Sequence, residues 1–223
     1  MISRPPADLT DVRDSYDRVA DTYAELVDST GMGDLVSTPW LLGAVDAFAA
    51  ATMPLGPLLD VGCGPGTVTA HLAARGADVL GVDLSPGMVD RARTRHPQCR
   101  FEVASATELD LAPASWGGIL SWWSLFNLPR DIVGEVVAGF AEALVPGGQL
   151  LVALHAGEGE RVRTEAYGGV PVAWTTHLWR PEEFTEVVRA AGLRVVADLR
   201  LPAPDPQSGP AFVLCAEKPP TGR

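Results

Sequence analysis

The stretch from Leu58 to Gly66 constrains the fold of this chain more than any other segment. An apolar run ends there in three alternating glycines, and a helical pattern from Thr67 to Arg75 follows at once. Glycines at such a point let the backbone turn tightly and approach a ligand at a helix N-terminus. Asp83 ends the next apolar run, 23 residues after Asp60, where an acid can accept hydrogen bonds from both hydroxyls of a ribose. The segment therefore predicts a strand, a turn and a helix that bind a nucleoside-containing cofactor.

Apolar runs and helical patterns alternate along the rest of the chain. The runs that predict strands are 58–61, 79–82, 101–103, 118–122, 149–154, 194–201 and 211–217. The patterns that predict helices are 11–28, 39–51, 67–75, 85–95, 130–144 and 181–190. The alternation predicts a parallel sheet, and the last two strands, with no helix between them, predict an antiparallel hairpin at its edge. The expected fold class is α/β: a Rossmann-like, doubly wound, seven-stranded sheet, mostly parallel with an antiparallel C-terminal strand.

The charge balance narrows the expected partners. Lysine and arginine total 17 against 28 acidic residues, which gives a formal net charge of −11. An acidic surface repels phosphate backbones, so we expect no nucleic-acid partner. No apolar run reaches the ~18 residues that span a bilayer, so we expect no membrane partner.

The cysteines indicate a reducing compartment. Cys63, Cys99 and Cys215 lie far apart without a CxxC pair, so we expect no metal site, and their odd number argues against a disulfide framework. The N-terminus from Met1 to Asp14 is polar and has no signal-peptide core. The expected location is cytoplasmic, and the oligomeric state stays open.

The glycine-rich turn favours one cofactor over another. A dinucleotide fingerprint needs glycine or alanine at position 67, where this chain has Thr67. Asp60 stands where a pyrophosphate would arrive, and no lysine or arginine lies between Pro54 and His71 to neutralise it. A carboxylate there suits an ammonium or a sulfonium group instead. These residues favour S-adenosylmethionine over NAD, and the remaining alternative is a turn whose glycines serve packing alone.

Four motifs together resemble the class I S-adenosylmethionine-dependent methyltransferases, in particular small-molecule members of bacterial secondary metabolism. Three of them span Leu59–Gly66, Gly81–Met88 and Leu144–Leu151. The fourth, Tyr16–Tyr23, is similar to the helix that caps the cofactor in small-molecule members. The chain departs from many members at Ser105, where they carry an acid, and at Gly117-Gly118, where they carry an aspartate.

The resemblance implies roles for individual residues. Asp60 and the glycines after it would hold the methionine end of the cofactor, and Asp83 would bind the ribose. Leu84, Ser105 and Ala106 would contact the adenine. The strand end at Ser121 would lie beside the methyl group, under a lid formed by the first helix. The cofactor-binding set is Tyr16, Tyr23, Asp60, Gly62, Cys63, Gly64, Asp83, Leu84, Met88, Ser105, Ala106, Ser121 and Trp122. For the two tyrosines, seven residues apart on one helix face, a core stripe is the alternative to a lid.

Aromatic and polar residues near the carboxyl ends of the strands indicate where a substrate binds. The predicted substrate-binding residues are Trp123, Phe126, Asn127 and Trp174, although such aromatics can also pack beneath helices. Methyl transfer to oxygen or nitrogen requires loss of a proton, and histidine is the natural general base near neutral pH. The candidates are His155, which ends the fifth strand, and His177 in the segment after it.

The expected organisation is a single methyltransferase domain over 1–223. It comprises an N-terminal helical cap (1–53), a cofactor-binding core (54–155), a substrate-side insertion without clear periodicity (156–180), and a C-terminal helix and strand hairpin (181–223). Pro146–Gly148 predicts a turn before the fifth strand.

The expected function is methyl transfer from S-adenosylmethionine to a small, apolar or aromatic metabolite by in-line displacement. One alternative is a protein of the same fold that binds the cofactor without methyl transfer, as a cyclase or a ligand sensor. A nicotinamide-dependent oxidoreductase is the other.

Overall fold

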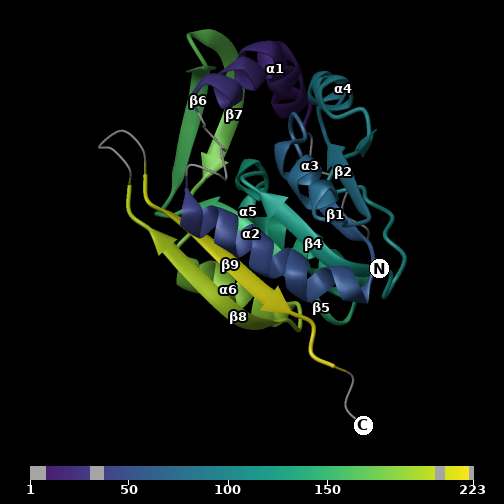
Figure 1. Ribbon diagram of the computed structural model, residues 1–223. Helices are drawn as coiled ribbons and strands as arrows, with labels where there is room; N and C mark the ends of the chain where they lie inside the picture. Colours follow the sequence, from purple (N-terminus) through teal and green to yellow (C-terminus); the bar gives the residue numbers. More distant parts are fainter. Residues whose placement is uncertain (1–8, 31–37, 204–208, 221–223) are drawn as a thin grey trace.

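The computed structural model describes residues 9–30, 38–203 and 209–220. Its main sheet has seven strands in the order β3-β2-β1-β4-β5-β9-β8 (Figure 1). Strand β9 runs antiparallel to both of its neighbours, and the pairs from β3 to β5 are parallel. The strands are β1 (Leu58–Val61), β2 (Val79–Asp83), β3 (Arg100–Val103), β4 (Trp116–Trp122), β5 (Leu144–His155), β8 (Arg194–Leu201) and β9 (Ala211–Glu217). The predicted fold class and the edge hairpin are confirmed.

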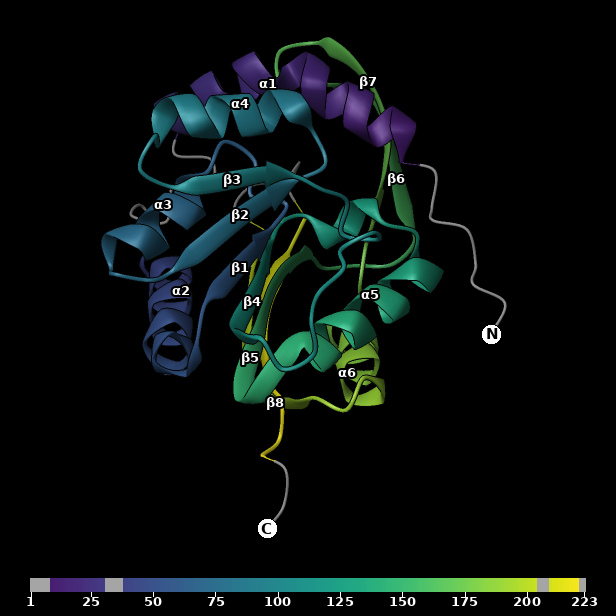
Figure 2. The same ribbon diagram turned by 90° about the vertical axis from the view of Figure 1, so that its right-hand side faces the viewer.

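Helices cover both faces of the sheet. On one face α2 (Pro39–Thr52) and α3 (Thr67–Ala74) share a core cluster with β1, β4 and β5. On the other, α5 (Arg130–Ala143) and α6 (Pro181–Ala190) pack against the same strands. The short 3-10 turns η1 (Met53–Leu55) and η2 (Leu125–Asn127) precede β1 and follow β4. Figure 2 shows these helices on the two sides of the sheet.

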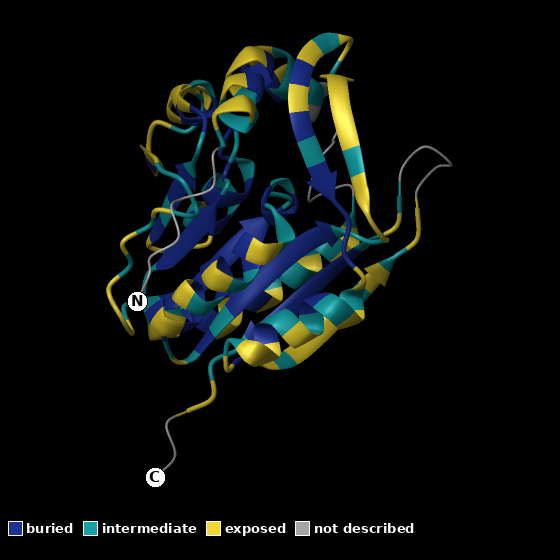
Figure 3. Ribbon diagram, turned by 180° about the vertical axis from the view of Figure 1, so that it is seen from behind, coloured by how far each residue is buried: buried dark blue, intermediate teal, exposed yellow. Residues whose placement is uncertain are grey.

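Strand β1 lies in the middle of this arrangement, and its sequence explains why. All four of its residues are buried. Leu58 faces the α2 and α3 side, whereas Leu59 and Val61 face the α5 and α6 side. A continuous apolar run is typical of a strand covered on both faces. Figure 3 shows the central strands as the most deeply buried part of the molecule.

Helix α1 (Thr10–Thr30) lies beside α4 (Pro86–Arg95), above the sheet in the views of Figures 1 and 2. The carboxylate of Asp17 accepts hydrogen bonds from the hydroxyl of Ser85 and, at 2.8 Å, from the N–H of Gly87. These donors belong to the first turn of α4, whose N–H groups have no partner within the helix. Asp17 therefore fastens α1 to the start of α4.

The segment 156–180 forms a two-stranded antiparallel hairpin of β6 (Glu160–Ala166) and β7 (Val170–His177), whereas the sequence predicted no regular structure there. Strand β7 packs against α1. The N–H of Ala173 donates to Ser15 Oγ at 2.8 Å, and Arg18 Nη1 donates to the carbonyl of Pro171 at 2.6 Å. The hairpin and α1 are thus joined by polar contacts as well as by packing.

Two glycine pairs explain local departures from the expected pattern. A Cβ on Gly117 would lie 2.6 Å from the carbonyl oxygen of Thr52, and one on Gly118 would lie 2.6 Å from Phe48 Cζ. The close approach of α2 to β4 therefore requires residues without side chains at positions 117 and 118. The predicted turn at 146–148 belongs to β5, because Gly147 and Gly148 exchange backbone hydrogen bonds with Lys218.

None of the helices within the described ranges combines the length and the apolar character that crossing a bilayer demands.

Candidate functional site

The turn after β1 adopts the conformation that its glycines allow. Gly62, Gly64 and Gly66 have φ angles of +78°, +53° and +85°, a region that other residues rarely occupy. A Cβ on Gly62 would lie 2.2 Å from the Cβ of Ser124, so the loop after β4 can approach only because no side chain is present. The N–H of Gly64 donates to the carboxylate of Asp83 at 2.8 Å, which ties the turn to the end of β2.

Asp60 is a carboxylic acid in the core of the site. It is 1% exposed and accepts a hydrogen bond from the hydroxyl of Thr69 at 2.6 Å. Its other oxygen, Oδ1, has no partner within the described part of the chain. Burial, with a smaller contribution from the charge of Asp83, raises the pKa of Asp60 from 3.8 to about 7. A cationic ligand group nearby would favour the ionised form and supply the missing partner.

Asp83 and Tyr23 lie next to the same turn. The carboxylate of Asp83 accepts from the N–H groups of Gly64 and Ser85, and burial still raises its pKa above the ordinary value. Burial and the charge of Asp83 raise the pKa of Tyr23 to about 12, so its hydroxyl keeps its proton at neutral pH. A Cβ on Gly64 would lie 3.9 Å from the ring of Tyr23, which places this side chain over the turn.

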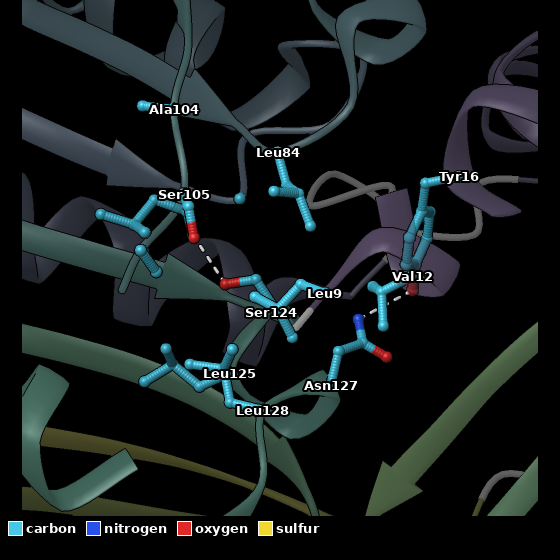
Figure 4. Close-up of a pocket in the computed structure, with 13 residues that line it drawn as sticks. Leu9, Val12, Tyr16, Leu84, Ala104, Ser105, Ser124, Leu125, Asn127 and Leu128 are labelled. Carbon is cyan, nitrogen blue, oxygen red and sulfur yellow. Dashed lines mark hydrogen bonds between the residues drawn. The ribbon is translucent and has the colours of Figure 1, made fainter. Parts of the chain in front are cut away.

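The first cavity lies between the strand ends and α1 (Figure 4). Leu84 enters it from one side and Asn127 from the opposite side, while Tyr16 and Val12 close a third side. The residues that line it are Leu9, Val12, Tyr16, Val61, Gly62, Leu84, Ala104, Ser105, Ala106, Ser124, Leu125, Asn127 and Leu128. Its volume is about 70 Å³, well below the ~300–1,000 Å³ of most ligand pockets. A nucleoside therefore needs more room than this cavity offers, and α1, which carries Val12 and Tyr16, forms one of its walls.

A second cavity of about 230 Å³ lies on the other side of Tyr16. It is lined by Tyr16, Phe126, His155, Arg163, Glu165, Ala166, Tyr167, Trp174 and Thr176. Tyr16 stacks on Trp174 with ring centroids 4.7 Å apart, and its hydroxyl accepts a hydrogen bond from Asn127 Nδ2 at 3.0 Å. The same tyrosine therefore forms a wall of both cavities.

His155 has a distinct electrostatic environment in the second cavity. Its ring lies 4.8 Å from that of Phe126 and 5.2 Å from that of Trp123, measured between centroids. Burial, together with the charges of Arg161 and Arg163, lowers the pKa of His155 from 6.5 to about 4. The imidazole is consequently neutral at pH 7 and able to accept a hydrogen bond, but it is a weak base.

Comparisons with known proteins agree with this geometry. Residues 58–148 match the model of a methyltransferase domain family. The chain is 31% identical, over 186 residues, to N-demethylindolmycin N-methyltransferase of Streptomyces griseus, covering 71% of this chain and 78% of that protein. The chain belongs to the S-adenosylmethionine-dependent methyltransferases. Its relatives are methyltransferases of the small-molecule type, and S-adenosylmethionine is the cofactor.

Solved structures of this class share the fold. A Burkholderia thailandensis 1,6-didemethyltoxoflavin-N1-methyltransferase, crystallised with 1,6-didemethyltoxoflavin and S-adenosylhomocysteine, superposes with a TM-score of 0.63 and 22% identity. That match covers 98% of this chain and 93% of the other. The cyclase SpnF superposes with a TM-score of 0.66 and 17% identity, covering 97% and 99%. Transferases and a cyclase therefore share this architecture.

The groups around the first cavity suit parts of the methyltransferase cofactor, although the volume of about 70 Å³ is too small for the whole ligand. Asn127, which lines this cavity, and Asp60, which precedes the lining residues Val61 and Gly62, each have a buried Oδ1 without a partner within the described chain. An amino-acid ammonium group can donate to such atoms. Leu84 and the segment 104–106 offer an apolar surface of the kind that an adenine ring contacts. No lysine or arginine is among the described residues that line this cavity, so a pyrophosphate would find no counter-charge.

The structure brings many of the predicted site residues together. Those that line the first cavity are Tyr16, Gly62, Leu84, Ser105, Ala106 and Asn127, and those that line the second are Tyr16, Phe126, His155 and Trp174. Asn127, predicted to contact the substrate, thus lies on the cofactor side. Ser121 is fully buried behind the first cavity and shares a 2.6 Å hydrogen bond with Ser124.

Other predicted residues lie away from both cavities. Met88 packs against α1 beside Val19, Cys63 packs against α4, and Trp122 packs on the α2 side of the sheet. His177 is 8% exposed, and its Nδ1 lies 3.0 Å from Glu160 Oε1. Side chains alternate along a strand, so Thr176 faces the second cavity and its neighbour His177 does not.

Sequence reasoning missed several lining residues. Val12, Ser124, Arg163 and Thr176 line the cavities without having been predicted. Arg163 could have been found from the polar alternation of β6, had that segment been interpreted as a strand. The sequence carries no comparable signal for Ser124.

Proposed function

We propose that the chain transfers a methyl group from S-adenosylmethionine to a small, planar, aromatic or apolar acceptor held in the second cavity. The observation that carries the proposal is the position of Tyr16, which lines both cavities. In-line displacement requires donor and acceptor to approach along one axis. Two cavities that adjoin at one side chain place donor and acceptor next to each other, and displacement of Tyr16 would open the axis between them.

The residues that line the second cavity support a planar, aromatic or apolar acceptor. Phe126, Tyr167 and Trp174 contribute ring surfaces, and Tyr16 closes the side next to the cofactor. Aromatic side chains favour flat ligands, which can stack or meet their edges. The volume of about 230 Å³ restricts the acceptor, or the part of it that enters, to a small compound.

The chain's residues contribute positioning more than acid–base chemistry. When bound, S-adenosylmethionine supplies a methyl group on a positively charged sulfur. Asp60 and Asp83 hold the cationic and ribose ends of the ligand, and Asn127 fixes the hydroxyl of Tyr16 between the two cavities. His155 accepts a hydrogen bond from the acceptor, and its low pKa restricts it to acceptors that need little help in losing a proton.

A titration followed by a transfer assay tests this proposal. Calorimetry with S-adenosylmethionine, S-adenosylhomocysteine and NAD should show binding of the first two alone. Labelled S-adenosylmethionine and a panel of one- and two-ring compounds should then yield a labelled product. His155→Ala should lower turnover while leaving the affinity for S-adenosylhomocysteine unchanged, and full activity of this variant would remove His155 from the mechanism.

The alternative is a protein that binds the cofactor without transferring its methyl group. The fold shared with the cyclase SpnF favours keeping it as a second candidate. The two functions differ in one product, because only transfer releases S-adenosylhomocysteine. Conversion of an acceptor without that release would favour the alternative.

The biological setting stays a prediction. Three free cysteines suit the cytoplasmic location expected from the sequence. We likewise expect, from the sequence, a role in secondary metabolism and a small molecule as the binding partner.

A further inference from the structure

The charges around the second cavity are unusual for this protein. The side chains of Arg161 and Arg163 have neither an ion pair nor a hydrogen bond within the described chain, although acidic residues outnumber basic ones. Ten other described arginines each lie within 4 Å of a carboxylate: Arg13, Arg75, Arg91, Arg93, Arg100, Arg130, Arg180, Arg189, Arg194 and Arg200. The two uncompensated guanidinium groups lie on β6, and Arg163 lines the cavity.

The position of Arg163 directs its charge at the site. It pairs across the hairpin with Trp174, whose ring forms the adjacent wall. The charges of Arg161 and Arg163 both act on His155, which also lines the cavity. The hydroxyl of Thr176 lies on the same face of β7 as Trp174. One edge of the cavity is therefore cationic, and its walls are aromatic.

Glu165 is the one carboxylate among the residues that line this cavity. Its Oε2 lies 3.8 Å from the Cβ position of Gly169, at the tip of the hairpin. Glu165 forms no ion pair with Arg163, although the two residues are only two apart on β6. The acidic group thus lies toward the tip and leaves the charge of Arg163 uncompensated.

We infer that the acceptor is a planar organic acid, bound as its anion, with the acidic group at Arg163 and the ring against Trp174 and Phe126. This inference rests on the proposed function and names its substrate class. A guanidinium presents paired N–H donors that match a carboxylate in a bidentate geometry.

Three matched probes test the inference: 1-naphthoate, 1-naphthamide and 1-naphthylmethylammonium, each titrated by calorimetry at saturating S-adenosylhomocysteine. They share one ring system and differ in charge. We expect naphthoate to bind at least tenfold more tightly than the amide, and the ammonium compound to bind most weakly. Arg163→Gln should abolish the preference for naphthoate. Arg189→Gln, which alters an exposed arginine on α6 outside the cavity, should retain it.

Several outcomes would overturn the inference. Equal binding of acid and amide would do so, as would preference for the ammonium compound, especially if Glu165→Gln removed it. Failure of all three probes to bind while S-adenosylhomocysteine binds would also count against it. Failure of S-adenosylhomocysteine itself would instead contradict the proposed function. Because Arg163 is exposed and forms no ion pair, Arg163→Gln should keep the thermal midpoint of the parent, which a melting curve verifies.

Discussion

Replacing Asp60 with asparagine should remove the pH dependence that this buried acid imposes on stability. The pKa of Asp60 is about 7 in the folded chain, against an ordinary 3.8. At about 1.36 kcal/mol per pKa unit, ionising it in the folded state costs about 4 kcal/mol relative to the unfolded state. An amide of the same shape carries no such cost. It places one N–H₂ group in the core, which lacks a partner and costs about 1–3 kcal/mol.

The direction of this pH dependence follows from whether the folded or the unfolded state binds the proton of Asp60. The unfolded chain loses the proton of Asp60 above about pH 4, whereas the folded chain keeps it until about pH 7. Between these values the folded state binds more protons, so the free energy of unfolding falls as the pH rises. Over pH 5 to 8 this loss amounts to about 3 kcal/mol in the parent, and the Asp60→Asn variant does not share it.

Urea denaturation of both proteins at pH 5, 6, 7 and 8 measures this difference. The variant should gain about 3 kcal/mol relative to the parent across that range, with most of the change below pH 7. Asp110→Asn removes an exposed carboxyl group and serves as the control, for which the difference should stay flat. If the free energies of unfolding of Asp60→Asn and the parent change with pH in parallel, the argument that burial raises the pKa of Asp60 is refuted.

Four further substitutions follow from contacts described above. Asp83→Ala should weaken binding of S-adenosylmethionine by about 1.5–3 kcal/mol in calorimetry, and unchanged affinity would remove the ribose assignment. Gly118→Ala should lower the free energy of unfolding by about 1–3 kcal/mol, because its Cβ meets Phe48. Gly134→Ala on α5, whose Cβ meets nothing, should raise it by up to about 1 kcal/mol. Tyr16→Phe should lower turnover more than it lowers cofactor affinity, and equal losses would contradict a role at the shared wall.

The strands and helices of the core could be predicted because their signals are local. Each signal depends only on residues close to it in the sequence: the apolar run of β1, the glycines after it, and Asp83. In the structure β1 is a buried strand, and the turn after it contacts Asp83. The hairpin at 160–177 was missed because charged residues interrupt its pattern and Pro171 is the second residue of its second strand. Gly168-Gly169, both at positive φ, were the available turn signal.

The docking of α1 could not be predicted in the same way. Tyr16 and Tyr23 lie on one helix face by spacing alone, but the neighbours of that face depend on contacts between distant segments. Asp17 reaches Gly87, 70 residues away, and Ser15 reaches Ala173, 158 residues away. Single-sequence patterns carry no information on such pairs. That is why Met88 was predicted to contact the cofactor, although it packs against α1 instead.

The attachment of α1 to β7 through Ser15 and Arg18 links the two ligands energetically. Any outward shift of α1 that admits the nucleoside displaces Tyr16, and with it one wall of the acceptor cavity. The occupancy of each cavity then alters the free energy of filling the other. Such coupling is reciprocal, so the factor by which the cofactor changes acceptor affinity equals the factor by which the acceptor changes cofactor affinity.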